Sequence, residues 1–411
     1  VLSHKLGREV HAGDLVIAPV DLAYVQDGTG PLAFRQMEQM GFTAVAKPDR
    51  SIVFLDHAAP PPRKELAADH VYLRAFAAKT GMVLRDVGEG VCHQVAFERF
   101  VRPGDLIIGA DSHTVMGGAM GAFATGMGST DVAVALGLGK TWLRVPETLR
   151  IAVRGRLPVG VMAKDLILRV LGDIRSDGAT YMAMEWGGPT IRAMPMPERM
   201  TLANMAVEGG AKCGLLPSDD LTRRYLELHG REDDWRPIDA DPDATYAKVL
   251  EYDAAELGPL VATPGSEDNA VPIVYFSLHE VPIHQVYLGT CTNGRYEDLV
   301  VFTKIVQGHD KAPGTRVIVT PASKEVYMKA LRAGVIDSLL EFGALVNPPG
   351  CAACPGVHGG IPGDGENVLS TQNRNYRGRM GNPNAFVYLA SPMVAAATAI
   401  RGVIADPREV V

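Results

Sequence analysis

The 411-residue sequence lacks the features that mark several classes of protein. No apolar stretch approaches the roughly 18 residues that a membrane-spanning helix needs, and charged residues lie where a secretory signal would need its apolar run. No run of about five basic residues occurs, and the net charge is −7, so we expect neither nucleic acid nor a membrane as partner. Five cysteines are too few for a disulfide framework. These absences predict a cytoplasmic protein whose cysteines bind metal or act in catalysis.

Common catalytic motifs are also missing. The glycine-rich segment 117–126 has no clean G-x-G-x-x-G pattern, and Val134 stands where a P-loop would need its first glycine. His279 and His284 do not have zincin spacing, and Pro282 would break the helix that a zincin motif needs. No G-x-S-x-G elbow is present. The sequence therefore gives no support to a nucleotide-binding protein, a zincin or an α/β-hydrolase.

The hydrophobic pattern predicts an α/β protein of three domains. Short apolar strands alternate with helical segments over 1–146 and again over 256–411, which is typical of parallel sheets covered by helices. A smaller α/β domain is expected at 147–255, with a charged surface crossover at 231–243. The expected strands are 15–18, 52–55, 106–109, 149–154, 271–276, 285–289, 317–320 and 386–389, and the expected helices are 31–41, 64–80, 129–143 and 163–172.

Three of the cysteines occur where a loop could present thiolates to one centre. Cys351 and Cys354 form a C-x-x-C pair bounded by glycine and proline, and Cys291 comes just after an expected strand, where α/β sheets build their sites. Three thiolates suit an iron–sulfur cluster with one open iron, because electron-transfer clusters normally take four protein ligands. Incidental spacing or a structural zinc site are the alternatives. Zinc would need a further ligand, and Cys92 and Cys213 are more typical of ordinary buried cysteines.

Acidic residues and histidines follow two of the expected strands. Asp56 and His57 come after the strand at 52–55, and a carboxylate beside an imidazole can fix its tautomer and raise its basicity. Asp111 and His113 follow the strand at 106–109 and can face one pocket from an extended turn. Each residue alone is more often a cap or a satisfied polar group, so only their joint occurrence indicates acid–base chemistry.

Five segments in chain order together carry a family resemblance. They are DVGEGVCHQ at 86–94, GADSHT at 109–114, NMAVE at 204–208, GTCTN at 289–293 and STQNRNYRGR at 370–379. Over essentially its whole length the sequence resembles the aconitase superfamily, and within it the large subunits of isopropylmalate isomerases (3-isopropylmalate dehydratases) and of archaeal-type homoaconitases. The resemblance implies an α/β, three-domain aconitase-like fold that lacks the C-terminal swivel domain.

The resemblance also implies a cofactor and a set of roles. Cys291, Cys351 and Cys354 would hold a [4Fe-4S] cluster whose fourth iron binds the hydroxyl and a carboxylate of the substrate. His57 would donate a proton to the leaving hydroxyl. The remaining catalytic residues would be Asp56, His93, Asp111, His113 and Glu208, the substrate would be bound by Ser112, Arg374 and Arg379, and Asn204, Asn293 and Asn373 would lie beside the cluster ligands. Asn204 and Glu208 have i, i+4 spacing, which predicts one face of a helix, and arginine suits carboxylates because it binds them bidentately.

A Gly-Ser-Ser-Arg segment, which supplies the serine base in single-chain aconitases, is absent from this sequence. A small subunit carrying the swivel domain is therefore the expected partner, and the chain alone is expected to be inactive. The expected activity is the dehydration and rehydration of a small 2-hydroxy di- or tricarboxylic acid. Gln26 stands where many isopropylmalate isomerases carry histidine, so homoaconitase, 2,3-dimethylmalate dehydratase and maleate hydratase large subunits remain alternatives. Alternatives of another class are a cluster-free binding protein and a structural zinc protein.

Overall fold

The computed structural model describes residues 1–410, and their contacts form two units. Unit 1 comprises residues 1–87, 92–154 and 179–252, and unit 2 comprises 88–91, 155–178 and the chain from Asp253 onward. The three-domain division at 1–146, 147–255 and 256–411 stays a prediction. The units follow packing rather than chain order, because the helix at Ala163–Ile174 packs against strands of unit 2.

Unit 1 is built on a five-stranded parallel sheet. Its strands, in spatial order, are β4 (Val83–Arg85), β3 (Ser51–Phe54), β2 (Leu22–Gln26), β5 (Leu106–Gly109) and β6 (Phe123–Gly126). Every residue of β2, β3 and β5 is buried, as expected for strands covered on both faces. The carboxyl ends of parallel strands share one edge of a sheet, so the residues that follow β2, β3 and β5 meet there.

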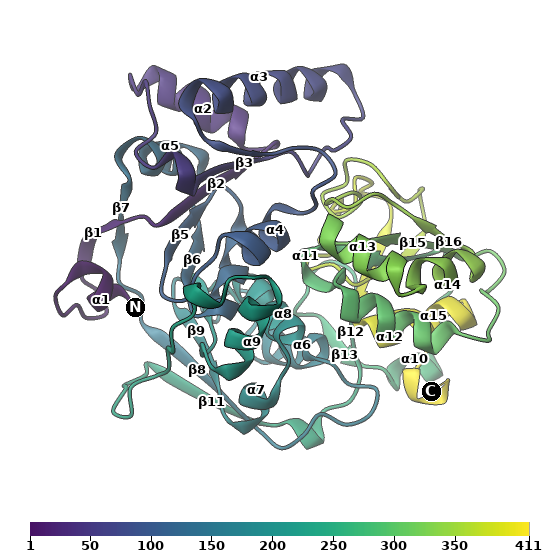
Figure 1. The fold of residues 1–411 in the computed structure, drawn as a ribbon. Helices are drawn as coiled ribbons and strands as arrows, with labels where there is room; N and C mark the ends of the chain where they lie inside the picture. Colours follow the sequence, from purple (N-terminus) through teal and green to yellow (C-terminus); the bar gives the residue numbers. More distant parts are fainter. Residues whose placement is uncertain (411) are drawn as a thin grey trace. The chain divides into compact units, whose positions relative to one another are not determined.

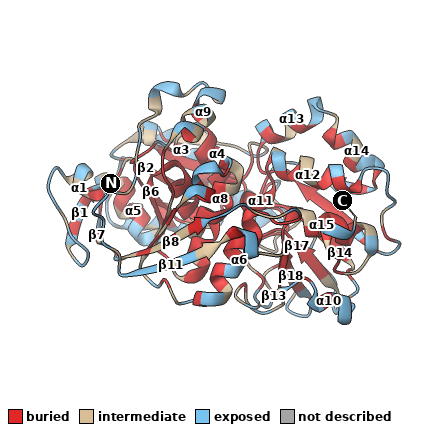
Figure 2. Ribbon diagram, turned by 90° about the horizontal axis from the view of Figure 1, so that it is seen from below, coloured by how far each residue is buried: buried red, intermediate tan, exposed pale blue. Residues whose placement is uncertain are grey.

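Helices cover this sheet, and two smaller sheets complete unit 1. In Figure 1, α2, α3 and α5 lie on one side of the five-stranded sheet, and Figure 2 shows that buried residues gather in its strands. One smaller sheet is an antiparallel ribbon of β1 (Leu15–Pro19) and β7 (Lys140–Arg144). The other has four strands, in the order β10 (Cys213–Leu215), β9 (Ala183–Gly187), β8 (Thr148–Arg154) and β11 (Lys248–Asp253). The helices are α1 (Leu2–Leu6), α2 (Gly30–Gln39), α3 (Lys64–Thr80), α4 (Cys92–Arg99), α5 (Ser129–Leu138), α7 (Pro189–Ala193), α8 (Met196–Met205) and α9 (Asp220–Leu228), with 3-10 segments η1 (Pro48–Arg50), η2 (Ser112–Met120), η3 (Ala206–Gly209) and η4 (Glu232–Asp234).

Unit 2 is built on a seven-stranded sheet that is parallel from β18 to β16 and antiparallel at the other edge. Its order is β13 (Ala270–Pro272), β12 (Leu260–Ala262), β18 (Phe386–Ala390), β17 (Asn367–Ser370), β14 (Gln285–Gly289), β15 (Arg316–Thr320) and β16 (Ala344–Val346). The helices are α6 (Ala163–Ile174), α10 (Tyr275–Leu278), α11 (Thr290–Asn293), α12 (Tyr296–Val306), α13 (Lys324–Arg332), α14 (Val335–Glu341) and α15 (Pro392–Arg401), with 3-10 segments η5 (Ala254–Glu256) and η6 (Pro407–Glu409).

Most expected elements are confirmed, and two need correction. The helix expected at 129–143 ends at Leu138, because Gly139 adopts a left-handed conformation with φ of 66° and caps it. Residues 140–144 form β7 instead, which alternates exposed and buried side chains against β1. The strand expected at 271–276 stops at Pro272 and is followed by the short helix α10, since proline has no amide hydrogen for the ladder.

None of the helices within residues 1–410 combines the length and apolarity needed to cross a bilayer.

Candidate active site

The loop after β3 is held in place by the buried carboxylate of Asp27, which follows β2. Asp27 accepts hydrogen bonds from the backbone amides of Asp56 (3.2 Å), His57 (2.8 Å) and Ala58 (2.8 Å), and it lies 2.9 Å from His70 Nε2 on α3. Burial opposes ionisation, but the bond from His70, the charge of His57 and the backbone bonds outweigh it and bring the pKa of Asp27 to about 2. The sequence analysis missed this anion, although an acidic residue directly after an apolar strand is the signal that singled out Asp56 and Asp111.

His57 lies between two carboxylates of unit 1. Its Nδ1 is 3.1 Å from Asp56 Oδ1, and its Nε2 is 3.6 Å from Asp111 Oδ2. Burial alone would lower the pKa of His57, but the charges of the nearby Asp56 and Asp111 carboxylates raise it well above its ordinary value. The imidazole therefore carries a proton near neutral pH, which is the state that a general acid needs.

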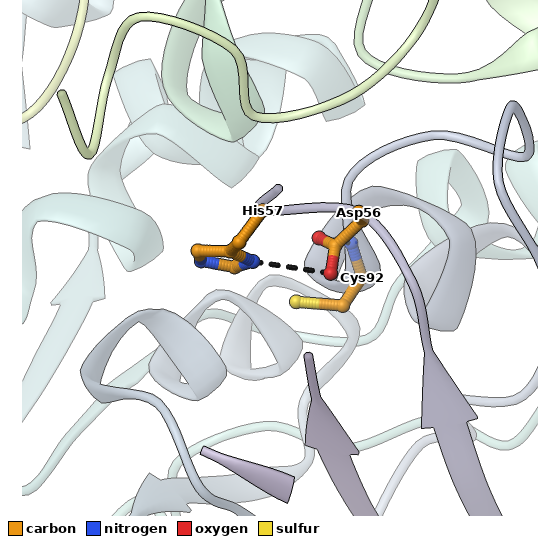
Figure 3. Close-up of side chains that lie close together, drawn as sticks. All are labelled: Asp56, His57 and Cys92. Atoms are coloured by element: carbon orange, nitrogen blue, oxygen red, sulfur yellow. Dashed lines mark hydrogen bonds and ion pairs between the residues drawn. The ribbon is translucent and has the colours of Figure 1, made fainter. Parts of the chain in front are cut away.

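Asp56 is itself positioned by the start of α4. Its second oxygen accepts a hydrogen bond of 2.7 Å from the backbone amide of Cys92. In Figure 3, His57 points toward the Asp56 carboxylate and the Cys92 side chain lies beside the pair. One ligand atom from each of these three residues lies within 4.8 Å of the others, so the Cys92 thiol belongs to the surroundings of His57. Cys92 is buried, as the sequence predicts.

A second network surrounds Asp111, the residue that caps η2. Asp111 Oδ1 accepts from the His113 amide (2.8 Å) and lies 2.9 Å from His93 Nε2, while His93 Nδ1 is 2.9 Å from the Tyr24 hydroxyl. Burial would raise the pKa of Asp111, but the charge of His93 and the hydrogen bonds from His93 and His113 hold it well below its usual range. Asp111 is therefore a carboxylate whose charge is balanced by imidazoles.

The network continues to Glu208. His113 Nε2 lies 2.7 Å from Glu208 Oε1, and both side chains are buried. The expectation that Asn204 and Glu208 share one helix is wrong: α8 ends at Met205 and Glu208 belongs to η3, which Gly210 caps with φ of 84°. Asn204 is fully buried in unit 1, and the Ser112 hydroxyl lies 3.5 Å from His113 Nδ1.

In unit 2, two of the three predicted cysteine thiols contact one side-chain amide, and the third cysteine shares a turn with one of them. Cys291 lies in α11 directly after β14, and Cys351 and Cys354 share a turn in which the Cys354 amide donates to the Cys351 carbonyl (3.2 Å). Asn373 Nδ2 lies 3.8 Å from Cys291 Sγ, and its Oδ1 lies 3.9 Å from Cys354 Sγ. Segments far apart in the sequence therefore bring the three predicted cysteines together.

Positive charge accompanies these thiols. Arg379 Nη2 lies 3.1 Å from Cys354 Sγ, and although burial would lower the pKa of Arg379, the charges of Cys354 and Cys351 raise it. A buried thiolate needs such a cation. A donor set of three buried thiols beside a guanidinium fits an iron–sulfur cluster with thiolate ligands. Arg374 lies on the same loop after β17, and the Asn293 amide donates to Asp298 (3.0 Å).

Two buried cations that the sequence analysis missed hold the loops of unit 2. Lys164 Nζ, on α6, donates to the carbonyls of Thr371 (2.9 Å) and Gln372 (2.5 Å). The Arg295 guanidinium donates to the carbonyls of Thr292 (2.6 Å) and Cys291 (2.5 Å). A lysine in an amphipathic helix normally reaches solvent, so no local pattern distinguishes Lys164.

Comparison with known proteins defines the class. The model of the aconitase family (aconitate hydratase) matches residues 1–402, so the chain belongs to this family. The chain is 54% identical to a 3-isopropylmalate dehydratase large subunit of Elusimicrobium minutum, over 100% of this chain and 98% of that protein. It is 52% identical to the 3-isopropylmalate dehydratase large subunit 1 of Thermotoga maritima, over 99% of this chain and 97% of that protein. It is 51% identical to the 3-isopropylmalate dehydratase large subunit 2 of Archaeoglobus fulgidus, over 100% of this chain and 98% of that protein.

A solved structure shares the fold. The crystal structure of Thermococcus kodakaraensis aconitase X in its holo form matches with a TM-score of 0.52 at 13% sequence identity, covering 88% of this chain and 84% of that chain. The expected aconitase-like α/β fold is therefore confirmed.

Proposed function

We propose that this chain is the large, cluster-bearing subunit of a hydro-lyase of the 3-isopropylmalate dehydratase type. The observation that carries the proposal is His57, held as an acid between Asp56 and Asp111 at the carboxyl edge of a parallel sheet. Relatives that match the whole chain at 51–54% identity carry that activity in their names. The reaction removes water from a 2-hydroxy dicarboxylic acid to give an alkene diacid, and adds it back at the neighbouring carbon.

His57 is the proposed proton donor to the leaving hydroxyl. Asp56 holds the Nδ1 side of the ring, which leaves Nε2, on the side of Asp111, to deliver the proton. Hydroxide is a poor leaving group, and protonation as it departs removes the need for strong acid. Asp27 fixes the three backbone amides of this loop and so acts as a positioning residue.

Asp111, His93, His113 and Glu208 are proposed to orient the water that leaves and returns. Hydrogen bonds join the Tyr24 hydroxyl, His93 and Asp111; Asp111 also accepts from the backbone amide of His113, and the His113 imidazole bonds Glu208. A proton accepted at one imidazole can be balanced by the next carboxylate, so the network can adjust to a neutral or an ionised oxygen. Ser112, Arg374 and Arg379 are proposed to bind the substrate's carboxylates.

Cys291, Cys351 and Cys354 are the proposed ligands of a [4Fe-4S] cluster. When bound, such a cluster supplies a Lewis-acidic iron that polarises the substrate's hydroxyl. Asn373 and Arg379 would support the thiolates through the contacts described above. Asn204 and Asn293 are assigned beside the cluster by the family resemblance alone.

A small subunit carrying the swivel domain is the proposed partner, and it would supply the base that takes the carbon-bound proton. The substrate is proposed to be 3-isopropylmalate in the cytoplasm. Enzymes that act on homocitrate, 2,3-dimethylmalate or maleate share the same chemistry. A higher rate with one of these acids would identify it as the substrate instead. A cluster-free binding protein or a zinc protein would show no dehydratase activity after reconstitution with iron and sulfide.

The test compares His57→Gln with the exposed control His309→Gln in the enzyme reconstituted anaerobically with its small subunit. Loss of a general acid is expected to lower kcat about 10²–10⁴-fold, with His309→Gln unchanged. Ultraviolet absorbance of the alkene diacid measures the rate for each candidate acid.

The pH profile sharpens this test. Because the pKa of His57 is raised, the acid form persists through neutral pH, and dehydration is expected to slow only as pH rises through that raised pKa. Asp56→Asn removes the largest charge that raises it, so the fall is expected at lower pH. Equal pH profiles for the unsubstituted enzyme and Asp56→Asn, or full activity in His57→Gln, would refute the role of His57.

A further inference from the structure

A cavity of about 400 Å³ opens at the carboxyl edge of the unit 1 sheet. Asp111 and Ser112 line one part of it, and Trp142, Tyr181 and Lys212 line another. We propose that this cavity is a subsite for a carboxylate of the substrate, bound by the ammonium group of Lys212. This inference rests on the proposed function and extends it, because it adds a cationic residue to the binding site.

Lys212 is a half-buried cation without an ionic partner. Among residues 1–410, no carboxylate lies within 4.0 Å of its ammonium group, whose contact is the ring of Tyr181 at 5.5 Å. Burial lowers the pKa of Lys212, and the charge of Asp131 opposes this only in part. A partly desolvated ammonium gains most from an anion that is brought to it.

The wall that carries Lys212 is fixed by Tyr181. This residue has φ of 59°, a left-handed conformation that is rare outside glycine and persists only where the surroundings determine it. Its amide donates to the Gly210 carbonyl (3.0 Å), and its hydroxyl accepts from the Arg144 amide (3.4 Å). The ring lies 4.9 Å from the Arg144 guanidinium, so it contacts two cations. Strained residues held in this way are typical of binding sites.

The cavity that Lys212 lines is also lined by Asp111, which lies 3.6 Å from His57 Nε2. Gly126 ends β6, and a Cβ there would lie 2.5 Å from the Asp111 carbonyl oxygen, so glycine allows the two loops to touch. The negative charge of Asp111 is balanced by its three histidines, and Asp131 is the other acidic residue lining the cavity. The volume is sufficient for a small dicarboxylic acid. A substrate reacting at His57 can therefore extend its second carboxylate toward Lys212.

The first experiment compares Lys212→Gln, Lys212→Arg and the control Lys140→Gln in the reconstituted enzyme. Lys140 is an exposed lysine on β7, two residues from Trp142, and it does not line the cavity. Lys212→Gln is expected to raise KM at least about tenfold with kcat changed much less, because loss of uniform binding acts on KM. Lys212→Arg is expected to retain most of the affinity. A KM in Lys212→Gln equal to that of Lys140→Gln would overturn the proposal.

The second experiment needs no catalysis. Trp142 lines the cavity and is 61% exposed, so its fluorescence reports on occupancy. Titration of the full chain with malate is expected to give a saturable change that is absent in Lys212→Gln and in Trp142→Phe, and much weaker with the monocarboxylate lactate. Equal responses to the two acids, or none that depends on Lys212, would overturn the subsite. A malate response in an enzyme that dehydrates none of the candidate acids would leave the subsite standing and refute the proposed function.

Discussion

The two units hold their functional loops with opposite charges. In unit 1, the Asp27 carboxylate accepts three backbone amides of the loop that carries Asp56 and His57. In unit 2, Lys164 and Arg295 donate to backbone carbonyls of the loops that carry Asn373 and Cys291. An anion thus supports the loop that bears an imidazolium, and cations support the loops beside thiols. In each unit, the charge beneath the loop is opposite in sign to the charge that the loop carries.

The largest effect is expected where a thiol is removed. Cys354→Ala is expected to abolish cluster binding, because three thiolates leave no ligand to spare. The matched control is Cys213→Ala, since Cys213 is fully buried in unit 1 and burial raises the pKa of its thiol to about 12. Visible absorbance and iron content after anaerobic reconstitution measure the difference. Equal cluster content in the two variants would contradict the assignment of the cysteines.

The next effect concerns the anion of unit 1. Asp27→Asn leaves His70 and the loop amides without their carboxylate, and it is expected to lower the free energy of unfolding by about 3 kcal/mol. Because the pKa of Asp27 is depressed to about 2, its contribution is complete above its ordinary pKa of 3.8 and is lost only as pH falls toward 2.

Urea denaturation at pH 7 measures this change, with Asp69→Asn as the control on the same helix as His70. Asp69 forms a partly exposed ion pair with Arg35, for which about 0.5 kcal/mol is expected. A loss for Asp27→Asn no greater than that of the control would show that the loop holds itself without the anion.

A smaller effect is expected for the cation of unit 2. Lys164→Met removes the donor to two buried carbonyls, which is expected to cost about 2 kcal/mol of unfolding free energy and to slow cluster insertion. Arg169→Met, on the same helix and about half exposed, is the control. If the two variants take up the cluster at the same rate, Lys164 has only a structural role. The comparison between the supporting charges of the two units would then not extend to cluster binding.

The strands and many of the acid–base residues could be predicted from the sequence, because apolar runs such as 52–55 and 106–109 end in Asp56 and Asp111. The strand at 22–26 was not predicted, and so the acidic residue after it, Asp27, was missed. Lys164 could not be foreseen, since its helix was predicted but the carbonyls it bonds lie more than 200 residues away.

The positions of the three cysteines after a strand and in a C-x-x-C loop singled them out, and the family resemblance agreed. The resemblance assigned Arg379 to the substrate, which stays a prediction, and the contact of its guanidinium with Cys354 could not be read from the sequence. The i, i+4 spacing of Asn204 and Glu208 was misleading for a local reason, because Gly209 and Gly210 close the helical segment early. Spacing rules describe regular helices and cannot show where one gives way to a tighter turn.

The low proton affinity of Asp27 has one more consequence. A side chain that stays ionised down to about pH 2 gives the loop above it the same shape in any medium in which the protein works. Asp27 itself is therefore silent in a titration of the enzyme between pH 5 and pH 9, and a change of rate in that range does not come from the anion beneath the loop.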